Sequence, residues 1–246
     1  MNVQMFWRMS ATALLLLLAI VATRGGSMIT ASQSATPPPA AASCDAAATP
    51  SAGMGMEMGT PGSGMEMGTP AMTAEFDQTY IDMMIPHHAS IVALSQAALP
   101  RLTDPRLRAL ASEIITAQTA EVEELRGYRE TFYGNPAPMM LSEQEMGRVM
   151  PGMTMPMGDM MAQMDAATQV ETFCTATDPD LAFIDLVIPH HQSAIVASEA
   201  ALTEATHPEI REFAQRVIDA QVREIDELTA IRQERYGSGT PEPVGG

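Results

Sequence analysis

Apolar residues recur with a helical period in four stretches of the chain, and short breaks separate them. One stretch begins at Tyr80 and reads "YIDMMIPHHASIVALSQAAL", and a near copy begins at Phe183 and reads "FIDLVIPHHQSAIVASEAAL". The pattern predicts helices near 73–99, 104–133, 178–202 and 208–236. No alternating strand pattern competes with this assignment.

The expected helix ends carry residues suited to them. Asp178 followed by Pro179 is typical of an N-cap and first helical residue, and a proline also restarts the chain after Asp104 and His207. Gly134 and Gly237 supply the expected stops. Each repeat should therefore form two long helices joined by a short connection.

The two halves of the helical region are copies of one another. Residues 77–134 align with 180–237 at a constant offset of 103 without a gap, and 25 of the 58 positions are identical. Each copy forms one helical hairpin, which cannot bury its apolar face alone. The sequence therefore predicts an all-α fold, an antiparallel four-helix bundle built from two duplicated hairpins.

The segments around the hairpins divide the rest of the chain. Segment 27–72 consists mainly of Ala, Pro, Gly, Ser and Met and is expected to be a disordered tether. The full prediction is a signal peptide or N-terminal anchor at 1–26, the Met-rich linker at 27–72, repeat one at 73–137, a Met-rich inter-repeat linker at 138–177, repeat two at 178–237 and a disordered tail at 238–246.

Composition narrows the function classes. The formal net charge is −17, and all 13 basic residues are arginine, so Schiff-base chemistry on a lysine is excluded. So acidic a chain favours cations and not nucleic acid. Arg8 precedes the apolar run 11–22, which indicates export to the periplasm or the cell surface, with a membrane anchor as the alternative to cleavage. In that oxidising setting Cys44 and Cys174 are free to pair, although their spacing does not decide it.

Four of the five histidines lie in the two IPHH copies. At 100° per residue, His88 and His191 share the apolar face of their helices, whereas His87 and His190 lie at its edge. Pro86 and the equivalent proline of repeat two are expected to bend the helix one turn away. The second helix of each repeat carries a polar layer at the same level, formed by Gln118, Glu121, Gln221 and Glu224.

An antiparallel hairpin pairs residues whose numbers have a nearly constant sum. By this rule Asp77 should contact Arg129, and Asp180 should contact Arg232. Unpaired buried charges are costly, so both pairs are expected to be structural locks of the hairpins.

Two interpretations of the histidine layer remain open. The histidines could be core residues that hydrogen-bond to Gln or Glu without any ligand. Alternatively they bind a transition metal, because imidazole suits copper, zinc, iron and nickel and thioether selects Cu(I). The metal interpretation takes as candidate ligands or orienting residues His87, His88, His190, His191, Met83, Met84, Glu121, Glu224, Gln118 and Gln221. Loop methionines in M-x-M spacing add a second candidate set: Met54, Met56, Met58, Met65, Met67, Met153, Met155 and Met157.

The combination of Asp77, "MMIPHH" from Met83 and "QxxE" from Gln118 resembles the bacterial family DUF 305, in two tandem copies over roughly 73–237. The resemblance implies a ferritin-like helical bundle, and some members are associated with copper binding and tolerance outside the cytoplasm. It therefore implies a copper ion as the bound metal. Methionines that the family pattern places after the histidines and after "QxxE" are replaced here by Leu94, Ala197, Leu125 and Leu228, which shifts the expected thioether role to the loops.

The sequence favours a protein without catalytic residues. A di-iron oxidase would need E-x-x-H on two helices, but the chain has only Glu204 to His207, across a helix end. A helical structural or interaction module remains the other alternative. The expected partners are metal ions and a copper-handling protein, with a membrane reached only through the N-terminal segment; a homo-oligomer stays open.

Overall fold

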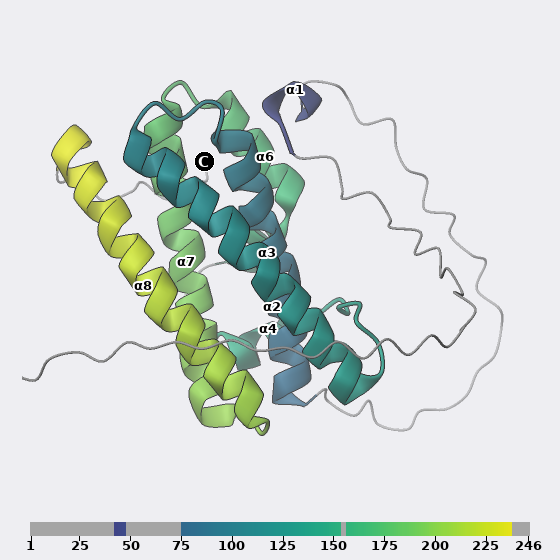
Figure 1. Ribbon diagram of the computed structural model, residues 1–246. Coiled ribbons are helices and arrows are strands. Elements are labelled where there is room, and N and C mark those ends of the chain that lie inside the picture. Colours follow the sequence, from purple (N-terminus) through teal and green to yellow (C-terminus); the bar gives the residue numbers. More distant parts are fainter. Residues whose placement is uncertain (1–41, 48–74, 154–155, 238–246) are drawn as a thin grey trace, which may run out of the picture. The chain divides into compact units, whose positions relative to one another are not determined.

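The computed structural model describes residues 42–47, 75–153 and 156–237, which all belong to the compact unit Ala40–Gly246. Four long helices form an antiparallel bundle (Figure 1): α2 (Phe76–Ala98), α3 (Pro105–Tyr133), α7 (Pro179–Glu204) and α8 (Pro208–Tyr236). Within the described residues there is no strand. The four helices predicted from the apolar pattern are therefore confirmed.

The predicted helix ends form as expected. The Asp178 carboxylate accepts a hydrogen bond from the backbone N–H of Leu181 at 3.1 Å, and Asp104 accepts one from Arg106 at 2.8 Å. A proline follows each cap at the first helical position. After α3, Gly134 has φ +75°, a conformation that costs little only without a Cβ.

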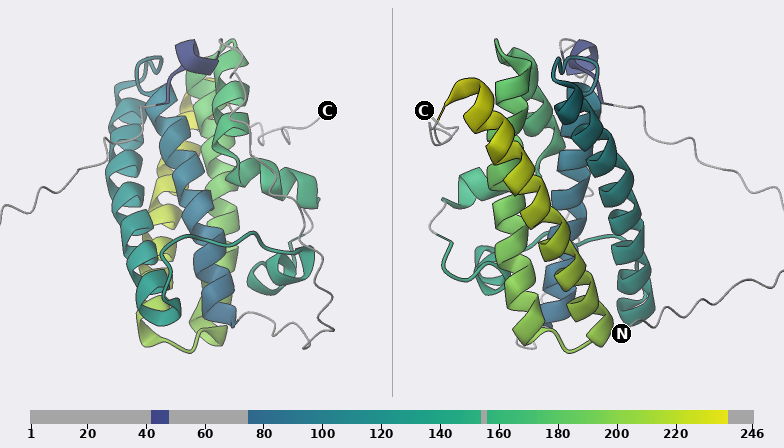
Figure 2. Two further views of the ribbon diagram at one scale, coloured as in Figure 1. Left: turned by 90° about the vertical axis from the view of Figure 1, so that its right-hand side faces the viewer. Right: turned by 60° about the vertical axis from the view of Figure 1, so that its left-hand side comes forward.

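The two hairpins meet mainly through α2 and α7, which run antiparallel to each other (Figure 2). Their contact includes a hydrogen bond of 2.9 Å between the hydroxyls of Tyr80 and Ser198. On the other side of the bundle, Arg216 of α8 donates to Glu124 of α3 at 2.6 Å. Apolar side chains of all four helices fill the space between.

The Met-rich composition of the inter-repeat linker suggested a loose loop, but the linker is largely helical. It forms α4 (Glu143–Val149), α5 (Met157–Met164) and α6 (Ala166–Thr175), and all three pack on α2. Met146 and Val149 of α4 are buried. Apolar methionine side chains of the linker therefore pack against α2, a contact that composition alone does not predict.

The expectation that 27–72 lacks regular structure is wrong at one place. Cys44–Ala47 form a short helical turn, α1, and Cys44 makes a disulfide bond with Cys174 of α6. Arg101 lies beside this bond, donating to the Cys174 carbonyl at 3.0 Å. Residues 27–41 and 48–72, the segment 1–26 and the tail 238–246 lie outside the described residues. No helix in the described part of the chain is long and apolar enough to cross a membrane.

The predicted ion pairs are wrong by one helical turn. Arg129 contacts Asp82, not Asp77, with Nε 2.7 Å from Oδ1, and Arg232 contacts Asp185 at the same distance. The reason is that Cα–Cβ bonds tilt toward the N-terminus of their helix. A long arginine therefore reaches back toward the hairpin connection and meets a carboxylate one turn nearer to it.

The two aspartates left over join the hairpins to each other. Asp77 accepts hydrogen bonds from the backbone N–H groups of Thr206 and His207, at the start of α8. Asp180 accepts them from Thr103 and Asp104, at the start of α3, at 2.8 and 3.1 Å. Each aspartate thus satisfies two backbone N–H groups in the helix connection of the other repeat.

Candidate metal centre

All four paired histidines are buried at the middle of the bundle. His88, His190 and His191 are fully buried and His87 is 1% exposed. The prediction that His87 and His190 lie at the edge of the apolar face holds for each helix alone but not for the bundle. Their edges face each other where α2 meets α7, and the two ring centroids lie 3.8 Å apart.

A symmetric set of hydrogen bonds holds this central pair. The Nε2 atom of His87 lies 2.8 Å from the Ser193 hydroxyl, and Nε2 of His190 lies 3.0 Å from the Ser90 hydroxyl. Each serine sits one helical turn after the histidine of its own repeat. Its hydroxyl is also within 2.7 Å of that histidine's carbonyl oxygen.

The serines determine which ring nitrogen carries the proton. A hydroxyl has one proton to donate, and each serine faces only acceptors apart from the histidine. Ser90 faces the carbonyls of His87 and Gln163, and Ser193 faces the carbonyl of His190 and the side-chain oxygen of Gln163. We therefore assign the proton to Nε2 of both central rings, which leaves Nδ1 as an unprotonated acceptor.

The outer histidines face carboxylates from the second helix of their own repeat. Nε2 of His191 lies 2.7 Å from Glu224 Oε2, a hydrogen bond in which the ring donates. Nε2 of His88 lies 3.3 Å from Glu121 Oε2, without hydrogen-bond alignment. Burial raises the pKa of Glu121, but the contact with His88 and the charge of Arg216 lower it, and together these effects outweigh burial, so the pKa is lowered.

The Nδ1 atoms of all four rings are buried and have no hydrogen-bond partner among the described residues. Burial lowers the pKa of His87 and His190 well below its usual range, and the neighbouring imidazoles lower it further. These two rings are therefore neutral at physiological pH. Neutral imidazole with a free lone pair is the form that binds metal.

The other predicted site residues divide by position. Gln118 and Gln221 are buried as expected, and their side-chain oxygens have no partner within the described part of the chain. Met83 and Met84 are both fully buried in α2. Met153 is partly buried against the core. The described side chains do not include Met157, nor the loop candidates Met54, Met56, Met58, Met65, Met67 and Met155.

The cluster is not preformed around one point. Among residues 42–47, 75–153 and 156–237, no three His, Cys, Asp or Glu side chains are placed to hold one ion together. The donor set nevertheless fits a transition metal, because four imidazole rings lie in one buried layer and each has an Nδ1 atom without a hydrogen-bond partner among the described residues. Binding would require the side chains to rotate toward a shared centre.

Three contributors to this layer were not recognised as such in the sequence. Ser90 and Ser193 occur at the same position of both repeats, three residues after the first histidine, and this repetition was the available signal. Gln163 bridges the two serines from α5. Nothing in the sequence places a linker residue over the contact between α2 and α7.

Comparisons with known proteins agree with this architecture. The family described as Domain of unknown function (DUF305) matches residues 28–129 and 77–232. A protein named CopM, solved in a Cu(I)-bound form, is 26% identical with a TM-score of 0.52, covering 65% of this chain and 98% of CopM. Its Cu(II)-bound form gives 27% and 0.51, with 65% and 97% coverage, and Ag-bound forms are also similar.

Two further proteins are similar to this chain. A DUF305 protein from Streptomyces coelicolor, described as a candidate secreted protein, is 20% identical with a TM-score of 0.53, covering 70% of this chain and 98% of its own. The uncharacterized protein L153 of Acanthamoeba polyphaga mimivirus is 39% identical over 49 residues, 20% of this chain and about a third of that relative. The first of these shows the fold alone.

Proposed function

The chain belongs to the DUF305 family, and we propose that it is an exported copper-binding protein that sequesters copper or confers tolerance to it. The proposed ligands are the imidazoles of His87, His88, His190 and His191. Met83, Met84 and the M-x-M methionines of the two Met-rich segments would form a second, thioether class of ligands. Gln118 and Gln221 would close the imidazole layer.

The observation that carries this proposal is the set of four buried Nδ1 atoms without partners. An unpaired buried acceptor costs free energy, and one such histidine could be tolerated as packing. Four in one layer are the arrangement that metal coordination would satisfy. Glu121 and Glu224, opposite Nε2 of the outer rings, would fix the tautomer that presents Nδ1 to the ion.

The choice of copper rests on the donor types and on the solved relatives. Imidazole also suits zinc, iron and nickel, but the thioethers favour the soft ion Cu(I). CopM was solved with Cu(I), Cu(II) and Ag, and 26–27% of its residues are identical to this chain. The copper would be cargo, and the protein would have no catalytic activity of its own.

The proposed location and partners rest on the N-terminal segment, the disulfide and the net charge. The apolar run after Arg8 and the Cys44–Cys174 disulfide both support a periplasmic or extracellular location. The partners would be metal ions and a copper-handling protein, with no nucleic acid because of the acidic charge. Contact with a membrane would occur only through the N-terminal segment.

The alternative function is a helical structural or interaction module. It is favoured by the hydrogen bonds at Nε2 of His87, His190 and His191, which satisfy one nitrogen of each ring. The di-iron interpretation has less support. Glu204 ends α7 and His207 binds Asp77 at the end of the bundle, away from the central layer.

A histidine variant distinguishes these functions. We expect the parent protein to bind Cu(II) and Cu(I) at pH 7.5 in competition titrations. The variant with His87, His88, His190 and His191 all changed to Gln should lose the binding that weakens in acid as the imidazoles take up protons. Because burial lowers the pKa of His87 and His190, this weakening is expected below the ordinary imidazole pKa of about 6.5. Thioethers do not titrate, so binding by methionine should persist in acid.

The fifth histidine provides the matched control. His207→Gln removes an imidazole outside the cluster and should leave copper binding as in the parent. Circular dichroism reports whether each variant keeps its helices. If the folded four-histidine variant binds copper as the parent does, the histidines are core hydrogen-bonding residues and the structural-module function is correct.

A further inference from the structure

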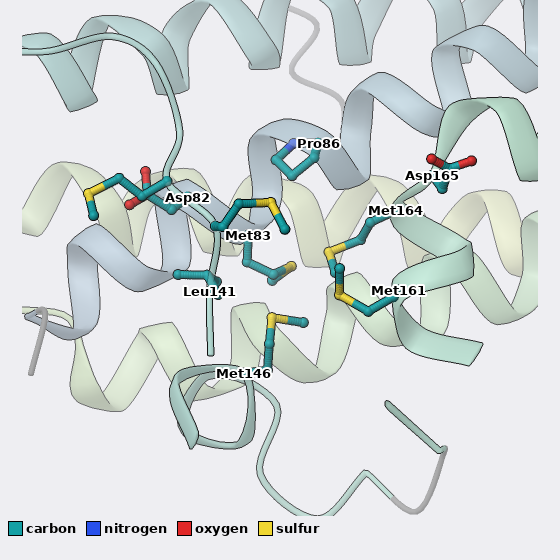
Figure 3. A pocket seen from close by; sticks show the side chains of 10 residues that line it. Asp82, Met83, Pro86, Leu141, Met146, Met161, Met164 and Asp165 are labelled. Carbon is teal, nitrogen blue, oxygen red and sulfur yellow. The ribbon is translucent and has the colours of Figure 1, made fainter. Parts of the chain in front are cut away.

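A second candidate site lies outside the histidine layer, on the outer face of α2. It is a cavity of about 260 Å³ whose walls come from α2, α4, α5 and the segments beside them (Figure 3). Six of its ten lining residues are methionine. We call these six the thioether pocket: Met83, Met139, Met140, Met146, Met161 and Met164. Only Met83 belonged to the ligand set expected from the sequence.

The methionines form a path from solvent to the core. Met83 is fully buried and Met146 is 1% exposed, whereas Met161, Met139 and Met140 are 38%, 59% and 85% exposed. Figure 3 shows Met83 of α2, Met146 of α4 and both Met161 and Met164 of α5 extending toward a common space. Methionine often fills irregular gaps in a core, which would explain the buried members. Gap filling does not explain exposed thioethers at the mouth of the same cavity.

The pocket offers a donor set of one chemical kind. The chain has two cysteines and both are in the disulfide, so no thiolate competes with the thioethers. Its two carboxylates are already engaged: Asp82 pairs with Arg129, and Asp165 accepts from the backbone N–H of Thr168 at 2.7 Å. Both carboxylates contribute negative electrostatic potential, but their existing contacts leave them less available to bind a hard metal ion. Thioether sulfur selects soft ions such as Cu(I) over Zn²⁺ or Ca²⁺.

We infer that the thioether pocket is a binding site for a soft monovalent cation, Cu(I) or Ag(I), held by Met83, Met146, Met161 and Met164. The inference rests on the proposed function for the identity of the natural ion, but the site is separate from the histidine layer. Methionine side chains have three rotatable bonds, so two or three sulfurs can close on one ion inside a cavity larger than the ion.

The duplication supports a role specific to this pocket. In repeat two, Asp185 and Pro189 occupy the positions of Asp82 and Pro86, but Leu186 stands where repeat one has Met83. Leu186 occupies the equivalent position of α7 and is also buried, with 6% exposure. A thioether at this position is therefore not required by the bundle. Met83→Leu gives repeat one the residue that repeat two already carries.

Silver provides a probe without redox chemistry. We would label the full-length protein with ¹³C at the methionine methyl groups, assign the signals with single Met→Leu variants, and titrate with AgNO₃. The signals of Met83, Met146, Met161 and Met164 are expected to shift together and to saturate with one equivalent. Zn²⁺ at the same concentration should leave them unchanged.

Two variants with equal numbers of thioethers removed complete the test. The pocket variant changes Met83, Met146, Met161 and Met164 to Leu and should bind Ag(I) at least tenfold more weakly at this site. The control variant changes Met28, Met72, Met150 and Met160 to Leu, none of which belongs to a candidate ligand set or to the described lining of the cavity, and it should keep the parent affinity. Leu and Met have similar volume, so both variants are expected to remain folded.

Failure of this inference can be separated from failure of the proposed function. The inference is overturned if Ag(I) shifts only methionine signals outside the pocket, or if the two variants lose affinity equally. The titration on the parent protein decides the question even if a variant does not fold. The four-histidine variant should still show the Ag(I) shifts of the pocket, whatever becomes of its copper binding in the histidine layer.

Discussion

At the scale of single residues, the two equivalent arginine–aspartate pairs differ mainly in burial. Arg129 and Asp82 have side chains that are 3% and 1% exposed, whereas Arg232 and Asp185 are 11% and 22% exposed. α4 and α5 pack on α2, the helix of the first pair. Water screens the second pair more, so the same interaction should carry different free energies in the two repeats.

Arg129→Ala is therefore expected to cost more stability than Arg232→Ala. The first change leaves a buried carboxylate without its partner and should lower the free energy of unfolding by about 3–5 kcal/mol. The second should cost about 1 kcal/mol, because Asp185 can be hydrated. Urea denaturation of the two variants checks the difference, and equal costs would contradict it.

The serines after each IPHH illustrate the same scale in the candidate site. Each hydroxyl faces acceptors on one side and a ring nitrogen on the other, and so assigns the imidazole proton to Nε2. A serine three residues after a histidine has no such meaning in an isolated helix. It gains this role only from the helix that packs opposite.

At the scale of elements, Asp77 and Asp180 each link the first turn of their own helix to the helix connection of the other repeat. Burial alone would raise the pKa of each carboxyl. The hydrogen bonds that each accepts from the opposite connection, and for Asp180 also from Arg235, together outweigh burial, so both pKa values are lowered on folding. A lowered pKa means stability that is fully present above the unfolded value of about 3.9 and is lost as the pH falls through the folded value.

The pH dependence of Asp180→Asn tests this arrangement. At pH 6 the variant should be about 2–3 kcal/mol less stable than the parent, because it loses charge-assisted hydrogen bonds from Thr103 and Arg235. The gap should narrow as the pH falls through the lowered pKa of Asp180 and the carboxylate of the parent is protonated. Asp226→Asn, on the exposed face of α8, is the control. A gap that is independent of pH would show that the charge is not involved.

At the scale of the whole molecule, the disulfide joins the segment before the bundle to the linker inside it. Cys44 and Cys174 are separated by 130 residues, so the bond encloses all of repeat one and most of the inter-repeat linker. Such a cross-link restricts the unfolded chain, and the effect grows slowly with the length enclosed.

Replacing both cysteines by serine should lower the free energy of unfolding by about 2–4 kcal/mol, because the unfolded state regains that freedom. Thermal unfolding with and without a reducing agent provides the measurement. The reduced parent should match the serine variant, and the reducing agent should not affect the variant itself. A parent unaffected by reduction would mean that the bond constrains only the N-terminal segment.

The local pattern of residues was sufficient to predict the helices, their caps and the duplication. Helical period, Asp-Pro starts and glycine stops act within a few residues, so they can be identified before the chain folds. The same pattern located the four histidines at the middle of the bundle. It could not show that His87 and His190 face each other, because the periodicity within one helix does not determine how a neighbouring helix packs against it.

Tertiary structure alone decided which long-range partners meet. Because side chains tilt toward the N-terminus of their helix, Arg129 contacts Asp82 and not the predicted Asp77. Asp77 is then available to accept a hydrogen bond from Thr206 of the other repeat. The thioether pocket needed α4 and α5 to fold back on α2, which their Met-rich composition did not indicate. These contacts depend on surfaces built from distant segments, and such surfaces exist only after the helices have packed.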